Sequence, residues 1–120
     1  MNEKKQPSNR QLKVAQQIRF LVSNFFIKED FIFENIDSKN LAIVDVIVSP
    51  DLKNAKIFVI TNSVSDNKIL INELNNKSKL IQKKIASNLT SKFTPKLKFF
   101  FDTSFEYSDK INNILETINR

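Results

Sequence analysis

The sequence predicts an α+β fold in which a three-stranded sheet carries helices on one face. Two segments rich in β-branched residues, Leu41–Val48 and 55–61, flank a stretch typical of a turn, which predicts an antiparallel hairpin. A third alternating segment, 96–102, follows a long helical pattern, and helical patterns also open and close the chain. The predicted order is therefore α-β-β-α(kinked)-β-α, in one domain spanning residues 1–120.

The first helix is predicted to begin after Ser8, because the Ser8 side chain can cap the backbone while Gln11 bonds back to it. Arg10 and Lys13 fall away from the apolar stripe, which recurs at helical spacing to about residue 26. The stripe consists of Val14, Ile18, Leu21, Val22 and Phe25. Residues 28–40 show no sustained period and are predicted to form a connection held by its aromatic side chains. The apolar residues of this segment are Phe31, Ile32, Phe33 and Ile36.

Both strands of the hairpin are predicted to be half-buried. In the first, Asp45 lies on the polar face, and the apolar face carries Val44, Val46 and Val48. In the second, Phe58 lies on the face opposite to Ile57 and Val59. Residues 49–54, with the sequence SPDLKN, form the turn between them.

The long middle helix is predicted to begin at a Ser65-Asp66 cap and to break near Ser78. Its apolar stripe lacks a hydrophobe at that position and consists of Leu70, Leu74, Ile81, Ile85 and Leu89. A small residue there allows close packing on the sheet. Alternatively, the helix kinks so that N–H groups at a new helix start meet a phosphate, and both interpretations can hold. Pro95 opens the third strand, and the last helix carries Ile111, Ile114, Leu115 and Ile118.

The composition excludes most enzyme classes. The 120 residues include no Cys, His or Gly. The sequence therefore offers no thiol nucleophile, disulfide, imidazole base or ordinary zinc site, and no glycine-rich phosphate loop. A metal-dependent hydrolase using Asp45, Asp51 and Asp102 is the remaining catalytic alternative, but Asp51 is better explained as a turn residue and Asp102 as a cap. We expect no catalysis, no metal and no cofactor.

The charge is polarised along the chain. Lys and Arg number 19 against 13 Asp and Glu, for a net charge of +6, which favours polyanionic partners. Residues 77–98 carry seven lysines and no acid, whereas residues 29–51 carry six acids and only Lys39. A solvated lysine face is the alternative, but lysines on the middle helix and on the strand after it are predicted to converge across one crevice. Phe58 and Phe100 either stack on unpaired bases or pack under a loop or the final helix.

Several segments resemble the ribosome-binding factor A family. Residues 46–59 (VIVSPDLKNAKIFV) are similar to the hairpin of that family, with its V-S-P-D-L-x-x-A-K pattern. Residues 14–19 (VAQQIR) resemble its first helix, and 95–99 (PKLKF) with 101–104 (FDTS) resemble its third strand and the turn after it. The resemblance covers about residues 8–118.

The resemblance implies a type II KH-like fold and a non-catalytic factor that binds the 30S subunit during late maturation of 16S rRNA, with a role in growth in the cold. The family's Ala-x-Gly kink falls at Lys77-Ser78-Lys79, where neither the Ala nor the Gly is present. A kink here would rely on Ser78 and its hydroxyl, with the flanking lysines contacting phosphate. The expected rRNA-binding residues are Arg10, Lys13, Lys77, Ser78, Lys79, Lys83, Lys84, Lys96 and Lys98.

The expected partner is thus 16S rRNA within the 30S subunit, bound by a cytoplasmic bacterial monomer with a flexible tail at residues 1–7. The polar start and the short apolar runs predict no secretory signal and no membrane span, and no small-molecule substrate is expected. The alternative is a general binder of single-stranded RNA or DNA with no tie to ribosome assembly, which the order of elements alone would permit.

Overall fold

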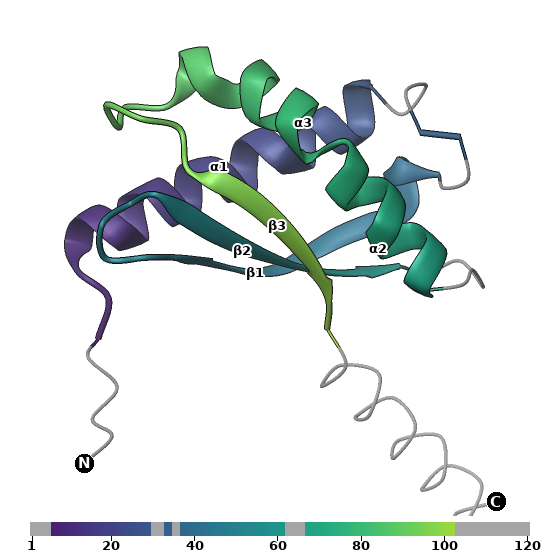
Figure 1. Ribbon diagram of the computed structural model, residues 1–120, viewed down its shortest axis with the longest axis horizontal. Helices are drawn as coiled ribbons and strands as arrows, with labels where there is room; N and C mark the ends of the chain where they lie inside the picture. Colours follow the sequence, from purple (N-terminus) through teal and green to yellow (C-terminus); the bar gives the residue numbers. More distant parts are fainter. Residues whose placement is uncertain (1–5, 30–32, 35–36, 62–66, 103–120) are drawn as a thin grey trace, which may run out of the picture.

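The computed structural model describes residues 6–29, 33–34, 37–61 and 67–102 (Figure 1). The elements follow the predicted order, although the predicted last helix and the Ser65-Asp66 cap lie outside the described residues. The elements are α1 (Asn9–Lys28), η2 (Ser38–Asn40), β1 (Leu41–Val48), β2 (Asn54–Thr61), α2 (Asn67–Asn76), α3 (Ser78–Ile85), η3 (Ala86–Asn88) and β3 (Lys96–Phe101). None of the helices in these ranges combines the length and the apolar content needed to cross a membrane.

The sheet has the order β1-β2-β3, with β1 antiparallel to β2 and β2 parallel to β3. Helix α1 packs against β1, while α2 and α3 pack against β3, and α1 also contacts α3. All three helices therefore cover the same face of the sheet, as Figure 1 shows. The predicted α+β layer arrangement is confirmed.

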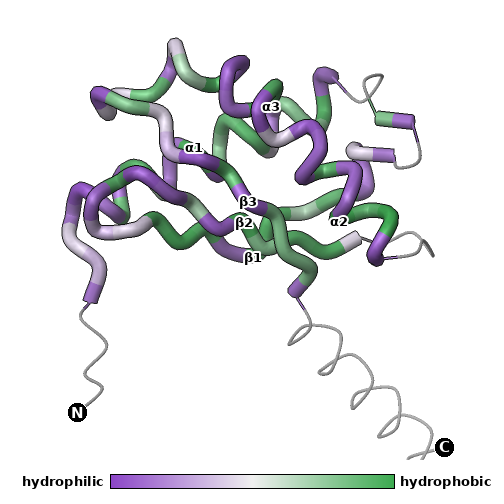
Figure 2. Tube along the Cα trace, in the orientation of Figure 1, coloured by the Kyte–Doolittle hydropathy of each residue, from purple (hydrophilic) through white to green (hydrophobic). Residues whose placement is uncertain are grey.

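Helix α1 begins as predicted. The Gln11 N–H donates to the Ser8 hydroxyl at 3.1 Å, and the Ser8 N–H donates to the Gln11 side chain at 2.8 Å, which completes a capping box. The helix buries one stripe against the sheet, while its polar residues face outward. Figure 2 shows this alternation of hydrophilic and hydrophobic residues along the helices. The Gln11 side chain also donates to the Val48 carbonyl at 2.9 Å, so the start of α1 is tied to the end of β1.

The prediction that Val44 lies on the buried face of β1 is wrong. Ile43 pairs with Val59 and Asp45 with Phe58, so Val44 is an extra residue, a β-bulge in the strand. The buried residues of β1 are Leu41, Ile43, Val46 and Val48, whereas Val44 is only half-buried. Because a bulge shifts the alternation by one residue, Ile43 takes the inward place that strict alternation gives to Val44.

The middle helix is broken, as the fold prediction requires. Helix α2 ends at Asn76, Lys77 adopts a non-helical ψ of 2°, and α3 starts at Ser78. The predicted stripe is buried through Ile85, after which η3 replaces the last predicted helical turn. The connection before β1 is held by Phe33, which is buried, while Phe31, Ile32 and Ile36 lie outside the described residues.

The edge of β3 is closed by a side chain from α2. The Phe99 N–H donates to the Asn75 side-chain oxygen at 2.8 Å, and the Asn75 amide donates to the Phe99 carbonyl at 3.1 Å. Asn75 thus occupies the place of a fourth strand for one residue. This pairing satisfies backbone groups that an edge strand would otherwise leave open.

Asn75→Ala is therefore expected to lower the free energy of unfolding by about 1–3 kcal/mol, because two part-buried backbone groups lose their partner. Urea unfolding followed by circular dichroism measures this. Asn76→Ala is the matched control, since Asn76 is exposed at the next position. Equal losses in the two variants would show that the Asn75 bonds do not stabilise the sheet edge.

Candidate nucleic-acid interface

The outer face of α3 carries two lysines one helical turn apart. Lys79 and Lys83 are exposed, and helical geometry places them opposite Ile81 and Ile85, which are buried. The helix contains no acidic residue. Two like charges at i, i+4 repel each other, so an approaching polyanion would relieve the repulsion as well as gain two contacts.

The other two lysines of residues 77–84 lie near carboxylates. Lys84 approaches Glu29, the residue after α1, with 3.7 Å between its Nζ and the carboxylate. Lys77 is half-buried and lines a cavity of about 360 Å³ that also includes Glu34 and Glu73. The nearby carboxylates partly offset these two charges, so Lys79 and Lys83 dominate the field of α3.

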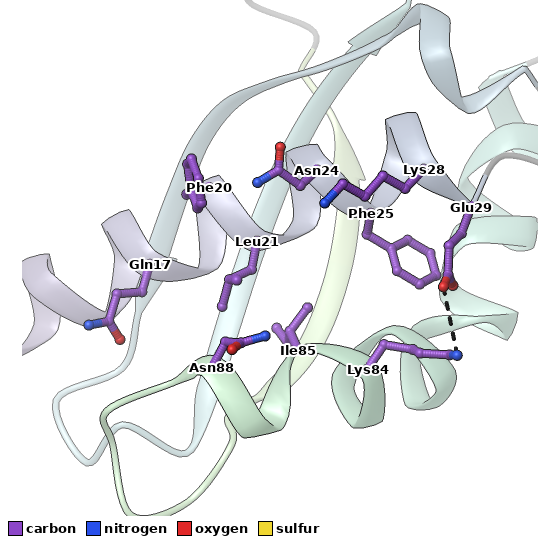
Figure 3. Close-up of a pocket in the computed structure, with 10 residues that line it drawn as sticks. All are labelled: Gln17, Phe20, Leu21, Asn24, Phe25, Lys28, Glu29, Lys84, Ile85 and Asn88. Atoms are coloured by element: carbon purple, nitrogen blue, oxygen red, sulfur yellow. Dashed lines mark ion pairs between the residues drawn. The ribbon is translucent and has the colours of Figure 1, made fainter.

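The Lys84 contact closes one end of a second cavity, of about 540 Å³, between α1 and α3. Figure 3 shows Lys84 extending from α3 toward Glu29, with Leu21 and Ile85 lining the cavity between the two helices. The ion pair is solvent-accessible and contributes little to stability. Its effect is to orient Lys84 toward α1.

The start of α3 lacks a side-chain cap in the described part of the chain. The Lys77 N–H is shared between the Glu73 and Leu74 carbonyls, at 3.1 and 3.2 Å, and the first bond of α3 runs from the Ile81 N–H to the Lys77 carbonyl at 2.9 Å. Backbone N–H groups at the first turn of a helix have no partner within that helix. Ser78 stands at this turn and is half-buried.

The predicted convergence of two lysine sets across one crevice is wrong. Leu97 and Phe99 point toward the helices, so Lys96 and Lys98 lie on the opposite face of the sheet. We call this the open face, because none of the described helices covers it. The sheet itself separates them from the lysines of α3. The prediction failed because the period of a strand fixes which residues share a face but not which face the helices cover.

The open face of the sheet has its own cluster of charge and aromatic rings. Lys56 is paired with Lys98 across β2 and β3, and like charges in such a pair are destabilising. Beside them Phe58 and Phe100 stack on each other, with ring centroids 5.5 Å apart and planes at 25°. The Lys98 Nζ lies 5.5 Å from the centre of the Phe100 ring.

Arg10 and Lys13 belong to a third basic region, at the start of α1. They line a cavity together with Lys92, from the segment between η3 and β3, and an adjoining cavity adds Lys53 and Phe93. The sequence did not predict Lys53, Lys92 or Phe93 as site residues. No pattern joins them to Arg10 and Lys13, because the five residues come from three separate segments.

The SPDLKN turn shapes this region. The Asp51 carboxylate accepts hydrogen bonds from the Ser49 hydroxyl at 2.6 Å and from the Lys53 N–H at 3.0 Å. The Ser49 hydroxyl bond, followed by the Lys53 N–H bond, lowers the pKa of Asp51. Leu52 adopts a positive φ of 62°, which is rare for a residue with a branched side chain. Asp51 is therefore a turn residue, as predicted.

The carboxylates considered for metal chemistry do not meet. Asp51 lies in the turn before β2, while the Asp102 N–H donates to the carbonyl of Val59 near the other end of that strand. The Asp45 carboxylate accepts the N–H of Val46. Among the described residues, no group of three or more acidic side chains could hold a metal ion.

Comparison with known proteins identifies the family. The family model described as ribosome-binding factor A matches residues 10–115. The chain belongs to the ribosome-binding factor A family. The ribosome-binding factor A of Pelagibacter ubique is 33% identical over 113 residues, which cover 94% of this chain and 93% of that protein.

Solved structures of ribosome-binding factor A share the fold. The crystal structure from Thermus thermophilus matches with a TM-score of 0.58 at 13% identity, covering 75% of this chain and 93% of that one. A homology model of the Thermus thermophilus factor, fitted into an electron cryomicroscopy map of a complex of the 30S subunit with ribosome-binding factor A, matches with a TM-score of 0.50 at 15% identity, covering 69% of this chain and 89% of that one. The chain thus has the KH-like fold of ribosome-binding factor A.

Proposed function

We propose that this protein is a non-catalytic ribosome assembly factor that binds the 30S subunit and assists late maturation of 16S rRNA. The observation that carries the proposal is the family match over residues 10–115. A homology model of a structurally similar relative was fitted into a map of its complex with the 30S subunit, which supports the same partner. The factor acts as one KH-like RNA-binding domain, as a monomer, in the cytoplasm where ribosomes assemble.

The distribution of charge supports an RNA partner. Lys79 and Lys83 form a basic face on α3, a helix without acidic residues, and the like charges of Lys56 and Lys98 are paired across β2 and β3 on the open face. Such arrangements cost stability in the free protein and are relieved when phosphates approach. The predicted rRNA-binding residues of α3 and β3 therefore contact rRNA on two faces of the molecule, the outer face of α3 and the open face of the sheet. Lys77, Ser78 and Lys84 lie at the margin of the α3 face.

A factor without catalytic side chains can act only through differential binding. The chain has no His or Cys, and its described carboxylates are engaged locally or lie apart. Binding one rRNA conformation more tightly than its alternatives shifts the population toward that conformation. This shift matters most in the cold, when misfolded rRNA is slow to rearrange, which accounts for the proposed role in cold growth.

Co-sedimentation with ribosomal subunits tests the function. The expected result is association with small subunits, stronger for immature than for mature particles, that weakens steeply as salt rises. Association with large subunits alone, or with neither subunit, would contradict the proposal. Equal affinity for small subunits and for any unstructured oligonucleotide would instead support the general single-strand binder.

A further inference from the structure

The third basic region is a groove built from three segments of the chain. Two adjoining cavities, of about 260 and 240 Å³, share four lining residues: Arg10, Leu52, Ser91 and Lys92. Arg10 comes from the first turn of α1, Leu52 from the β1–β2 turn, and the other two from the segment before β3. We call this the end groove. Lys13, Asp51, Lys53 and Phe93 complete its charged and aromatic lining.

Hydrogen bonds hold the three walls of the end groove in place. The Gln17 amide donates to the Thr90 hydroxyl at 3.0 Å, and the Thr90 N–H donates back to the Gln17 oxygen at 3.2 Å, which fixes the segment before β3 against α1. The Lys96 N–H donates to the Lys53 carbonyl at 2.8 Å, which ties the start of β3 to the turn. A groove fixed in this way loses little conformational entropy when it binds a ligand.

The charge of the end groove is strongly positive. Four cations line it, on Arg10, Lys13, Lys53 and Lys92, against the single carboxylate of Asp51. That carboxylate accepts hydrogen bonds from the Ser49 hydroxyl and the Lys53 N–H, and it attracts the charge of Lys53. Arg10, Lys13 and Lys92 therefore carry most of the positive charge that an anionic ligand would meet.

An exposed aromatic ring stands at the edge of the groove. Phe93 is 66% exposed, and the Lys92 Nζ lies 5.5 Å from the centre of its ring. Bases in a duplex already stack on their neighbours, so an exposed protein ring can stack only on a base that has left a helix. A ring beside a row of cations matches the alternation of base and phosphate in a single strand.

We infer that the end groove binds a single-stranded segment of RNA, with Phe93 stacking on one base while Arg10, Lys13 and Lys92 contact the flanking phosphates. The inference rests on the proposed function and adds to it the form of RNA that is bound. The groove lies where α1 begins and the β1–β2 turn ends, apart from the broken helix at Ser78. The two regions would therefore contact different parts of one RNA.

The test measures binding of the full chain to a labelled oligouridine of about ten nucleotides, a length within the usual range for single-strand sites, by fluorescence anisotropy. Phe93→Ala is expected to weaken binding at least about fivefold, the effect of losing one stacked base. Lys92→Ala is expected to weaken binding and to lower the slope of log affinity against log salt by about 0.7, for one lost phosphate contact.

Two matched controls separate the groove from general effects. Phe20 is 68% exposed on α1 and lines a different cavity, so Phe20→Ala should leave affinity within about twofold of the wild type. Lys28 is exposed at the other end of α1, so Lys28→Ala removes the same charge away from the groove.

Unchanged affinity in Phe93→Ala and Lys92→Ala would overturn the inference, and so would tighter binding of a duplex of the same length. Absence of any oligouridine binding by the wild type would overturn it as well. None of these results would change the expected co-sedimentation with small subunits. If the protein did not co-sediment with small subunits, the proposed function would be overturned independently of the end groove.

Discussion

Phe99→Ala is expected to lower the free energy of unfolding by about 3–5 kcal/mol, the usual cost of truncating a buried phenylalanine. Phe99 is fully buried in the strand nearest to α2, and its ring lies 6.2 Å from that of Phe26 in α1. The Phe99 side chain therefore links α1 to β3, the strand on which α2 packs. Since domains of this size are stable by only about 5–15 kcal/mol, much of the stability would be lost.

Chemical denaturation followed by circular dichroism measures the effect. Phe93→Ala is the matched control, because it removes the same ring from a side chain that is 66% exposed and should change stability by less than about 0.5 kcal/mol. The same measurement shows that a loss of oligouridine binding in this variant is not caused by unfolding. A loss below about 1 kcal/mol in Phe99→Ala would mean that the core does not depend on this contact.

Reversing the charges of Lys79 and Lys83 to glutamate should reduce affinity for small subunits on the order of tenfold or more. Each lysine that contacts a phosphate adds about one unit to the slope of log affinity against log salt, so the slope should fall by about two. Both side chains are exposed and point away from the core, so the fold should be retained. Lys84 is less suitable for this test, since a glutamate there would face Glu29.

The control reverses two lysines at the acidic end of the molecule, Lys28 and Lys39. Both are exposed, and the Ser38 hydroxyl bond to the Phe26 carbonyl places η2 beside the end of α1, so these two charges lie in one region. The double variant has the same net charge as the Lys79 and Lys83 variant. If both variants lost affinity equally, total charge and not the α3 face would determine binding.

Three basic regions thus point in different directions: the outer face of α3, the open face of the sheet and the end groove. The sheet separates the first from the second, because Lys98 lies on the side away from the helices. A small protein with basic surfaces on several sides is suited to lie between RNA segments. Binding of this kind would hold several RNA segments in one arrangement, which is the action that the proposed function requires.

Much of the local structure could be predicted from residue patterns. The capping box at Ser8, the turn at Asp51 and the broken helix near Ser78 are present where the local sequence placed them. Each depends on residues within a few positions of one another, so short-range chemistry is sufficient. The role of Ser78 in RNA binding stays a prediction.

Errors arose where distant segments meet. The bulge at Val44 follows from how β1 pairs with β2, and the direction of Lys98 follows from which face the helices cover. The end groove joins Arg10 to Lys92 through the packing of α1 against the segment before β3. No period within a single element contains this information.

The sequence by itself determined the element order, the family resemblance, the exclusion of thiol and imidazole chemistry, and the separation of acidic from basic stretches. Only the tertiary structure decided which lysines share a surface. The physical reason is that helix and strand periods fix the side of an element on which a residue lies, whereas long-range packing fixes what that side faces. Lys79 and Lys98, expected in one crevice, therefore lie on opposite sides of the sheet.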